Sequence, residues 1–228
     1  MKPINHVKQQ DHIAQTPPEE LPCLDKVKET CNLYYPQILA HHAPRPAILT
    51  CSTVGCIRRV DSYYMCQDCF YSQWYCKDCI VQIHEDNPLH YIKTWDVQAQ
   101  CMVSARLRDL GLVVKLIHEN GQSCASRGTL RELKVMHTTG MHEIVYWQCL
   151  CYQRQSNLSA RPAQLLANRL FPASETSPRT AFTFDVLRSF DSLNLQGSIN
   201  FKQFCDSIFF ATPEGFRLDK EVRAAHWQ

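Results

Sequence analysis

Residues 51–90 hold eight cysteines and histidines, and this cluster constrains the fold of the chain more than any other feature. The donors fall into four pairs: Cys51 and Cys56, Cys66 and Cys69, Cys76 and Cys79, and His84 and His90. A Cys-x-x-Cys turn directs two sulfurs at one ion, and structural zinc takes four thiolate or imidazole ligands. Consecutive Cys-x-x-Cys pairs followed by histidines are typical of zinc sites rather than of disulfides or buried thiols. The stretch predicts two closed zinc sites.

The four pairs can share two ions in two ways. In a sequential arrangement, the first two pairs hold one ion and the last two hold the other. In an interleaved arrangement, the first and third pairs share one ion, and the second and fourth share the other. We favour the interleaved arrangement because it ties together segments that are distant in sequence, which orders a small module without a large apolar core.

The run YYMCQDCFYSQWYCKDC, residues 63–79, resembles the ZZ-type zinc finger, whose two sites interleave. The resemblance implies one site made of cysteines alone and one of two cysteines and two histidines. The first would comprise Cys51, Cys56, Cys76 and Cys79, and the second Cys66, Cys69, His84 and His90. Four residues separate Cys51 from Cys56 where two are usual, which makes Cys51 the least secure ligand.

A second group of candidate ligands lies in residues 98–155. Strands are expected at 111–117, 131–137 and 142–151, the last two joined by a turn at Gly140. Cys149 and Cys151 are two residues apart in a strand, so they face the same side. His118 and Cys124 follow the first strand.

A third zinc site is therefore a hypothesis, with His118, Cys124, Cys149 and Cys151 as its ligands. His142 could replace His118, since it begins the last strand. The alternative is a pair of ordinary strand cysteines without a metal.

The overall fold class is expected to be α+β, in four parts: an N-terminal arm at 1–44, a two-zinc module at 45–97, a strand-rich cluster at 98–155 and a helical segment at 156–228. The arm combines a polar stretch that we expect to be disordered with a weakly helical pattern that breaks near Pro36. The zinc module should contain strands at 63–66, 73–76 and 91–95 and a helix over 77–85. Thr183 and Asn200 are the expected N-caps of two C-terminal helices.

Charge does not by itself indicate a nucleic-acid binder, because 24 basic residues nearly balance 22 acidic ones. Residues 101–170, however, carry nine Lys or Arg and four Asp or Glu. A basic face is expected there, although an ordinary solvated surface would have the same composition. The candidate DNA-phosphate contacts are Arg106, Arg108, Lys115, Arg127, Arg131 and Lys134.

Thirteen cysteines stand in a chain whose first twenty residues lack the apolar core of a signal peptide. No apolar run approaches the length of a membrane span. Clustered cysteines in a reducing compartment usually bind metal. We expect an intracellular, nuclear protein.

Several longer runs resemble the CxC-type cysteine cluster found N-terminal to KDZ transposases of fungi. They include YCKDCIVQIHEDNPLHYIKTW, LRDLGLVVKLIHENGQSC, GMHEIVYWQCLC and the region from QLLANRLF to INFKQF, and together cover about residues 50–210. The family is regarded as a zinc-chelating domain of a mobile-element protein, which adds support to the third site. In this chain, Ile117 stands where the family tends to have glycine, and CASRG lacks the usual proline after the cysteine.

The resemblance also implies that a transposase catalytic domain would follow, and we expect this chain to be truncated before it. DNA strand transfer needs divalent metal held by paired carboxylates. Asp185, Asp191 and Asp206 lie on expected amphipathic helices and are better explained as solvated charges. The chain is therefore not expected to be an enzyme.

The leading hypothesis for function is a non-catalytic zinc module that binds DNA or a protein partner for a KDZ transposase, or its remnant. The alternative is an independent ZZ-like peptide reader, whose acidic groove would use Asp61, Asp68, Asp78, Glu85 and Asp86. A catalytic zinc site would need a neighbouring general base, but Glu85 and Glu143 each adjoin a histidine without forming a His-Glu-x-x-His motif. Neither hypothesis requires a small-molecule substrate or a membrane.

Overall fold

The structure, a computed structural model, describes residues 24–42, 50–58, 62–71, 73–117, 127–150 and 160–217. The chain divides into two compact units, residues 1–43 and 44–228. The first unit contains helix α1, Leu24–His42, which runs through Pro36 without the expected break. A proline inside a helix removes one backbone hydrogen bond, and here the flanking turns continue despite that loss. The expected disorder of residues 1–20 lies outside the described residues.

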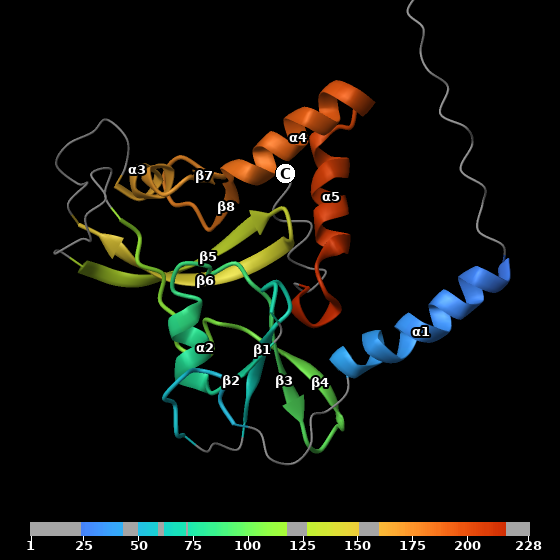
Figure 1. Ribbon diagram of the computed structural model, residues 1–228. Helices are drawn as coiled ribbons and strands as arrows, with labels where there is room; N and C mark the ends of the chain where they lie inside the picture. The colour runs from blue at the N-terminus through green and yellow to red at the C-terminus, as the bar shows by residue number, and fades with distance from the viewer. Residues whose placement is uncertain are drawn as a thin grey trace, which may run out of the picture. The chain divides into compact units, whose positions relative to one another are not determined.

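The second unit begins with a four-stranded antiparallel sheet in the order β2-β1-β3-β4 (Figure 1). Its strands are β1 (Tyr64–Cys66), β2 (Trp74–Tyr75), β3 (Ile92–Asp96) and β4 (Cys101–Ala105), and helix α2 (Lys77–Ile83) follows β2. Three strands and the helix occupy their expected places. β4 lies beyond residue 97, where the two-zinc module was expected to end, and pairs with β3 along its whole length.

A second sheet has the order β6-β5-β8-β7. Its strands are β5 (Arg127–His137), β6 (Gly140–Cys149), β7 (Leu170–Pro172) and β8 (Thr180–Thr183). The hairpin β5–β6 is the pair expected from the sequence. In place of the strand expected at 111–117 the structure has isolated bridge residues, of which Val114 pairs in parallel with Tyr146 beside the free side of β6.

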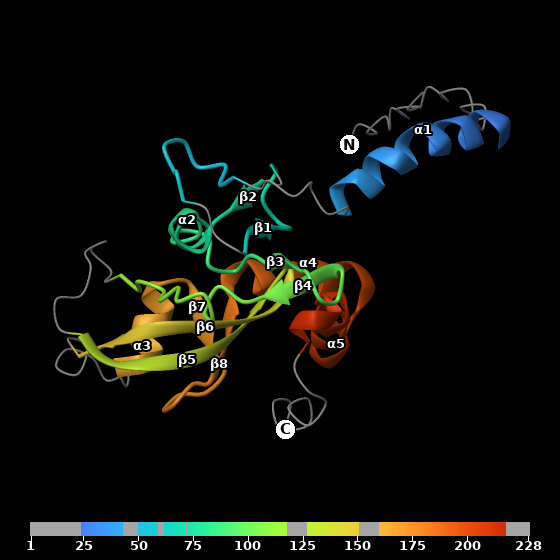
Figure 2. The same cartoon turned by 90° about the horizontal axis from the view of Figure 1, so that it is seen from below.

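Helices surround the second sheet (Figures 1 and 2). They are α3 (Ala160–Ala167), α4 (Phe184–Gly197), α5 (Phe201–Ala211) and a short 3-10 turn, Glu214–Phe216. Thr183 caps α4 by accepting a hydrogen bond from the Val186 backbone, and Asn200 forms a capping box with Gln203 at α5. Both caps were expected. Strands β7 and β8 were not, because their short segments stand between helical patterns.

Two apolar cores lie against the β5–β6 hairpin. Consecutive strand residues point to opposite faces, so Val135 and Met136, both fully buried, enter different cores. The first core also receives Leu165 of α3 and Leu170 of β7. The second receives apolar side chains of α4 and α5, including Phe204. The hairpin thus organises the C-terminal half of the chain.

Tyr91 joins the first sheet to the hairpin. Its hydroxyl donates to the Met141 carbonyl at 3.0 Å, and its ring stacks on His142 with centroids 4.3 Å apart. Burial raises the pKa of Tyr91 above the ordinary value of a tyrosine, so the phenol stays protonated and remains a donor. The two sheets are therefore in direct contact through a buried polar and aromatic junction.

Gly140, in the β5–β6 turn, should be intolerant of substitution. Its φ is +138°, and an added Cβ would overlap the Tyr91 hydroxyl and come within 2.8 Å of Thr212 Oγ1. We expect Gly140→Ala to lower the free energy of unfolding by about 2 kcal/mol, from backbone strain and displacement of this junction. Urea unfolding followed by tryptophan fluorescence measures the change.

Gly197→Ala is the matched control, because a Cβ there lies 3.7 Å from Ile199 in ordinary contact. That variant should be as stable as the parent or slightly more stable, since alanine favours helix. Equal stability of the two variants would contradict the assignment of strain to Gly140.

Candidate metal centres

The eight clustered donors gather into two groups of four. Within each group, the candidate ligand atoms all lie within 4.8 Å of one another. Site 1 comprises Cys51, Cys56, Cys76 and Cys79, and site 2 comprises Cys66, Cys69, His84 and His90. This grouping is interleaved, because the ligands of site 2 alternate in pairs with those of site 1 along the chain. In the sequential alternative, Cys51 and Cys56 would instead share an ion with Cys66 and Cys69.

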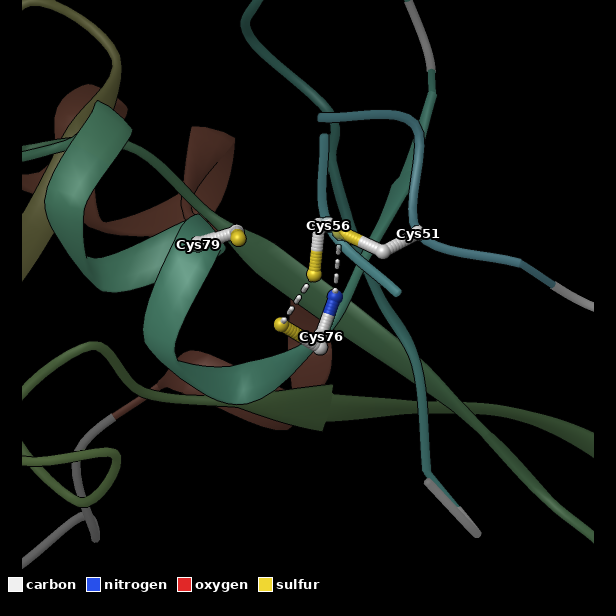
Figure 3. Close-up of side chains that lie close together, drawn as sticks. All are labelled: Cys51, Cys56, Cys76 and Cys79. Atoms are coloured by element: carbon white, nitrogen blue, oxygen red, sulfur yellow. Dashed lines mark hydrogen bonds between the residues drawn. The ribbon is translucent and has the colours of Figure 1, made fainter. Parts of the chain in front are cut away.

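Site 1 forms between a loop and the first turn of α2 (Figure 3). Cys56 Sγ lies 3.9 Å from Cys76 Sγ, and Cys51 Sγ accepts a hydrogen bond from the Cys76 backbone at 3.3 Å. The long spacing between Cys51 and Cys56 is taken up by a turn in which Cys56 N donates to Thr53 O, with Gly55 at a φ of +80°. Cys51 is therefore placed with the other three donors despite its unusual spacing.

Site 2 forms where β1 ends and α2 ends. Cys66 Sγ accepts hydrogen bonds from the backbone amides of Asp68 and Cys69, at 3.4 and 3.3 Å. His90 Nδ1 lies 3.4 Å from Cys66 Sγ and 3.5 Å from Cys69 Sγ. His84 Nε2 lies 3.5 Å from Cys69 Sγ. Two thiols and two imidazoles thus converge from three separate segments.

Helix α2 links the two sites. Its first turn carries Cys76 and Cys79 of site 1, and His84 at its C-terminal end belongs to site 2. His84 Nδ1 lies 2.8 Å from the Ile80 carbonyl, which fixes Nδ1 as the donor and leaves the Nε2 lone pair directed toward Cys69. Metal-binding histidines commonly show this arrangement, in which the second ring nitrogen donates to a carbonyl.

The spacing of the donors fits a tetrahedral ion. Zn–S bonds of about 2.3 Å and Zn–N bonds of about 2.05 Å place two sulfurs about 3.8 Å apart, and a sulfur and a nitrogen about 3.6 Å apart. The corresponding separations are 3.9 Å for the sulfurs of Cys56 and Cys76, and 3.4–3.5 Å for the sulfur–nitrogen pairs of site 2. Both groups could therefore hold a metal ion.

The thiols and imidazoles of both sites are ionisable groups in a protected environment. Burial raises the pKa of Cys66 to about 12 and lowers the pKa of His84. Burial also acts to raise the pKa of Cys51, but hydrogen bonds from Cys76 and Thr53 outweigh it and lower that pKa to about 6. A thiolate at Cys66 thus requires a nearby positive charge, which a bound cation supplies.

The third site remains a prediction, because His118, Cys124 and Cys151 lie outside the described residues. Cys149 is buried at the end of β6, and its backbone amide donates to Gln164 Oε1 at 3.0 Å. His142 lies near the other end of the same strand, seven residues away, a distance of about 23 Å in an extended chain. The alternative in which His142 joins Cys149 at one ion is therefore wrong on geometric grounds.

Three of the six candidate phosphate contacts have carboxylate partners. Arg106 and Arg108 both approach Glu143, at 3.6 and 3.3 Å, and Lys115 pairs with Glu85 at 2.7 Å. Arg131 instead donates to the Gln148 side chain at 2.9 Å. Lys134 lies in β5, and Arg127 is exposed at the start of that strand.

The acidic residues of the peptide-reader hypothesis are largely engaged within the protein. Asp68 accepts from the Tyr91 backbone at 2.6 Å, Asp78 pairs with Arg58, and Glu85 pairs with Lys115. Asp86 is exposed, and Asp61 lies outside the described residues. Two of the five acidic residues are thus paired with a basic side chain, and a third accepts a hydrogen bond from the backbone.

In the described part of the chain, no helix combines the length and apolarity that crossing a membrane requires. Neither the curated proteins nor the solved structures contain a match to this chain. A family model does match, over residues 107–214, which include the four candidate ligands of the third site but none of the eight candidate ligands of sites 1 and 2. The match begins later than the expected start near residue 50. The matching model describes the CxC2-like cysteine cluster associated with KDZ transposases.

Proposed function

We propose that this chain is a non-catalytic, zinc-stabilised binding module that serves a KDZ transposase, or descends from one, by holding DNA or a protein partner. The observation that carries the proposal is the pair of interleaved four-donor groups, joined to a segment that matches a transposase-associated family. Thiol ligands fit a reducing compartment, and a transposase partner places the module in the nucleus.

Zinc is the metal that fits these donors best. Four cysteine and histidine ligands in a tetrahedron are typical of structural zinc, whereas calcium and magnesium take oxygen ligands. When bound, the ion would cross-link the loop at 51–56, the turn at 66–69 and helix α2. Site 1 would use only thiolates, and site 2 would use two thiolates and two neutral imidazoles.

A structural role follows from the number of ligands. Catalytic zinc keeps an open position for water or substrate, usually with three protein ligands, and four protein ligands close it. The two glutamates next to histidines also have other partners: Glu85 pairs with Lys115, and Glu143 with Arg106 and Arg108. These contacts leave both carboxylates poorly placed as general bases.

The choice between nucleic acid and a basic peptide depends on the available charges. A ZZ-like reader needs free carboxylates for a peptide terminus or tail, yet Asp68, Asp78 and Glu85 have partners of their own. Within the described residues, by contrast, Arg131, Lys134, Arg161 and Arg179 lie near the β5–β6 hairpin without a carboxylate at ion-pair distance. We therefore favour a nucleic-acid partner over a peptide.

The interleaved pairing can be tested by double substitution and metal analysis of zinc-loaded protein. Cys56→Ser with Cys76→Ser should remove one ion per chain relative to the parent, because both belong to site 1. Cys56→Ser with Cys66→Ser should remove two, one from each site. Counting differences from the parent cancels any third ion.

The sequential arrangement predicts the reverse result for these two double variants. Cys101→Ser is the control, because Cys101 is exposed on β4 and outside both groups. It should leave the metal content unchanged.

Removing the metal should unfold the first sheet before the second. We expect a strong chelator to abolish amide-exchange protection in β1–β4 and α2, since their order depends on the cross-links at sites 1 and 2. The β5–β6 hairpin, which has two apolar cores, should keep more of its protection. Hydrogen exchange followed by mass spectrometry measures both regions.

Zinc should restore the lost protection, and magnesium should not. A metal-free protein that retained full protection in the first sheet would show that the ions are dispensable for its fold.

A further inference from the structure

A cavity of about 480 Å³ lies beside β5, away from sites 1 and 2. Its walls come from the turn after β4, from β5 and β6, from α3 and from the segment before β8. β8 pairs with β5 only over Lys134–Met136, and the Lys134 amide donates to the Arg179 carbonyl at 3.0 Å. The cavity therefore opens where β8 begins, next to the part of β5 that precedes this pairing.

The lining is predominantly basic. It contains five cationic side chains and two carboxylates: Arg108, Arg131, Lys134, Arg161 and Arg179, with Glu132 and Glu143. The carboxylates are directed at Arg108, whose guanidinium lies 3.3 Å from Glu143 and 3.9 Å from Glu132. Among the described residues, none of the other four cations lies within ion-pair distance of a carboxylate.

Two of these cations are held side by side by a neutral group. Arg131 Nε and Arg161 Nε both donate to Gln148 Oε1, at 2.9 and 3.3 Å, and Arg161 Nη1 donates to Ser177 Oγ at 2.6 Å. Both arginines are half-buried. Like charges in such proximity repel, and an amide oxygen only partly offsets this. An anion with several oxygens would complete the arrangement.

We propose that this cavity binds a backbone phosphate of a nucleic-acid strand, an inference that rests on the proposed nucleic-acid partner and names its point of contact. Arginine guanidinium groups bind phosphate oxygens in a fixed fork geometry. The volume is within the range of sites for small organic ligands, so a sugar-phosphate unit fits as well as the phosphate. Apolar lining is limited to Leu133, Tyr146 and Pro178, which offers little to the side chains of a peptide.

This site revises the set of expected phosphate contacts. Arg108, Arg131 and Lys134 were expected from the sequence and line the cavity. Arg161 and Arg179 were missed, because they lie in a segment that the sequence assigned to helices. Their approach to β5 depends on α3 packing against β6 and on the parallel pairing of β8 with β5, which no local pattern indicates.

The test is binding of the full chain to a random-sequence DNA duplex, measured by fluorescence anisotropy over a series of salt concentrations. Arg161→Gln with Arg179→Gln should weaken binding about 10-fold at low salt and reduce the slope of log affinity against log salt by about one, the value for one lost phosphate contact. Lys202→Gln is the matched control, with the same change of charge at an exposed position on α5. It should bind as the parent does.

Several outcomes would overturn the inference: no DNA binding by the parent, equal binding by the double variant and Lys202→Gln, or an equally arginine-dependent affinity for an acidic polyglutamate peptide. If inorganic phosphate competes with the duplex at the same concentration, the site binds a free anion instead of a nucleic-acid strand. Arg179→Gln alone, at an exposed side chain, serves if the double variant does not fold. Zinc content is measured in parallel, so that a loss of metal can be distinguished from a loss of DNA binding.

Discussion

Convergence of thiols and imidazoles from separate segments is the constraint on which the first sheet depends. The sheet has strands of two to five residues, and its two apolar clusters, around Ile80 and Ile92 and around Tyr63 and Trp74, themselves include the candidate ligands Cys51, Cys66 and Cys76. Site 1 ties a loop to the start of α2, and site 2 ties the end of the same helix to β1 and to His90 before β3. Because α2 carries candidate ligands of both sites, an ion at site 1 would hold the start of the helix, and an ion at site 2 would hold its end. Because the two sites are interleaved, they bring together turns that are separate in the sequence.

The β5–β6 hairpin plays the corresponding part in the rest of the chain, by a different physical means. It is covered by two apolar cores, so its order comes from burial. Tyr91 connects the first sheet to the β5–β6 hairpin. Because Tyr91 directly follows His90, a candidate ligand of site 2, the geometry of site 2 affects how Tyr91 contacts the hairpin. The charged side chains divide in the same way. Arg106 and Arg108 pair with Glu143, whereas Arg131 and Arg161 share the neutral acceptor Gln148.

The grouping of the eight clustered donors and three strands of the first sheet could be predicted from the sequence, because both have local signatures. Cys-x-x-Cys spacing directs donors to one point, and the caps at Thr183 and Asn200 depend on residues three positions away. The sequence did not indicate β4, β7 or β8, since strand pairing over long sequence distances leaves little trace in short segments. The expected helix break at Pro36 was also wrong, because a proline lowers the stability of a helix without always ending it.

The sequence alone determined that this chain would collect soft metal ligands in pairs, because the thiol and imidazole side chains and the short spacing between them can be read from the sequence directly. It left two pairings open. Tertiary structure decided between them by placing Cys76 beside Cys51 and Cys56, which requires β1, β2 and α2 to be folded together. It also decided that Arg131 and Arg161 would meet at Gln148, because residues from different strands and helices become neighbours only when the sheet and α3 pack.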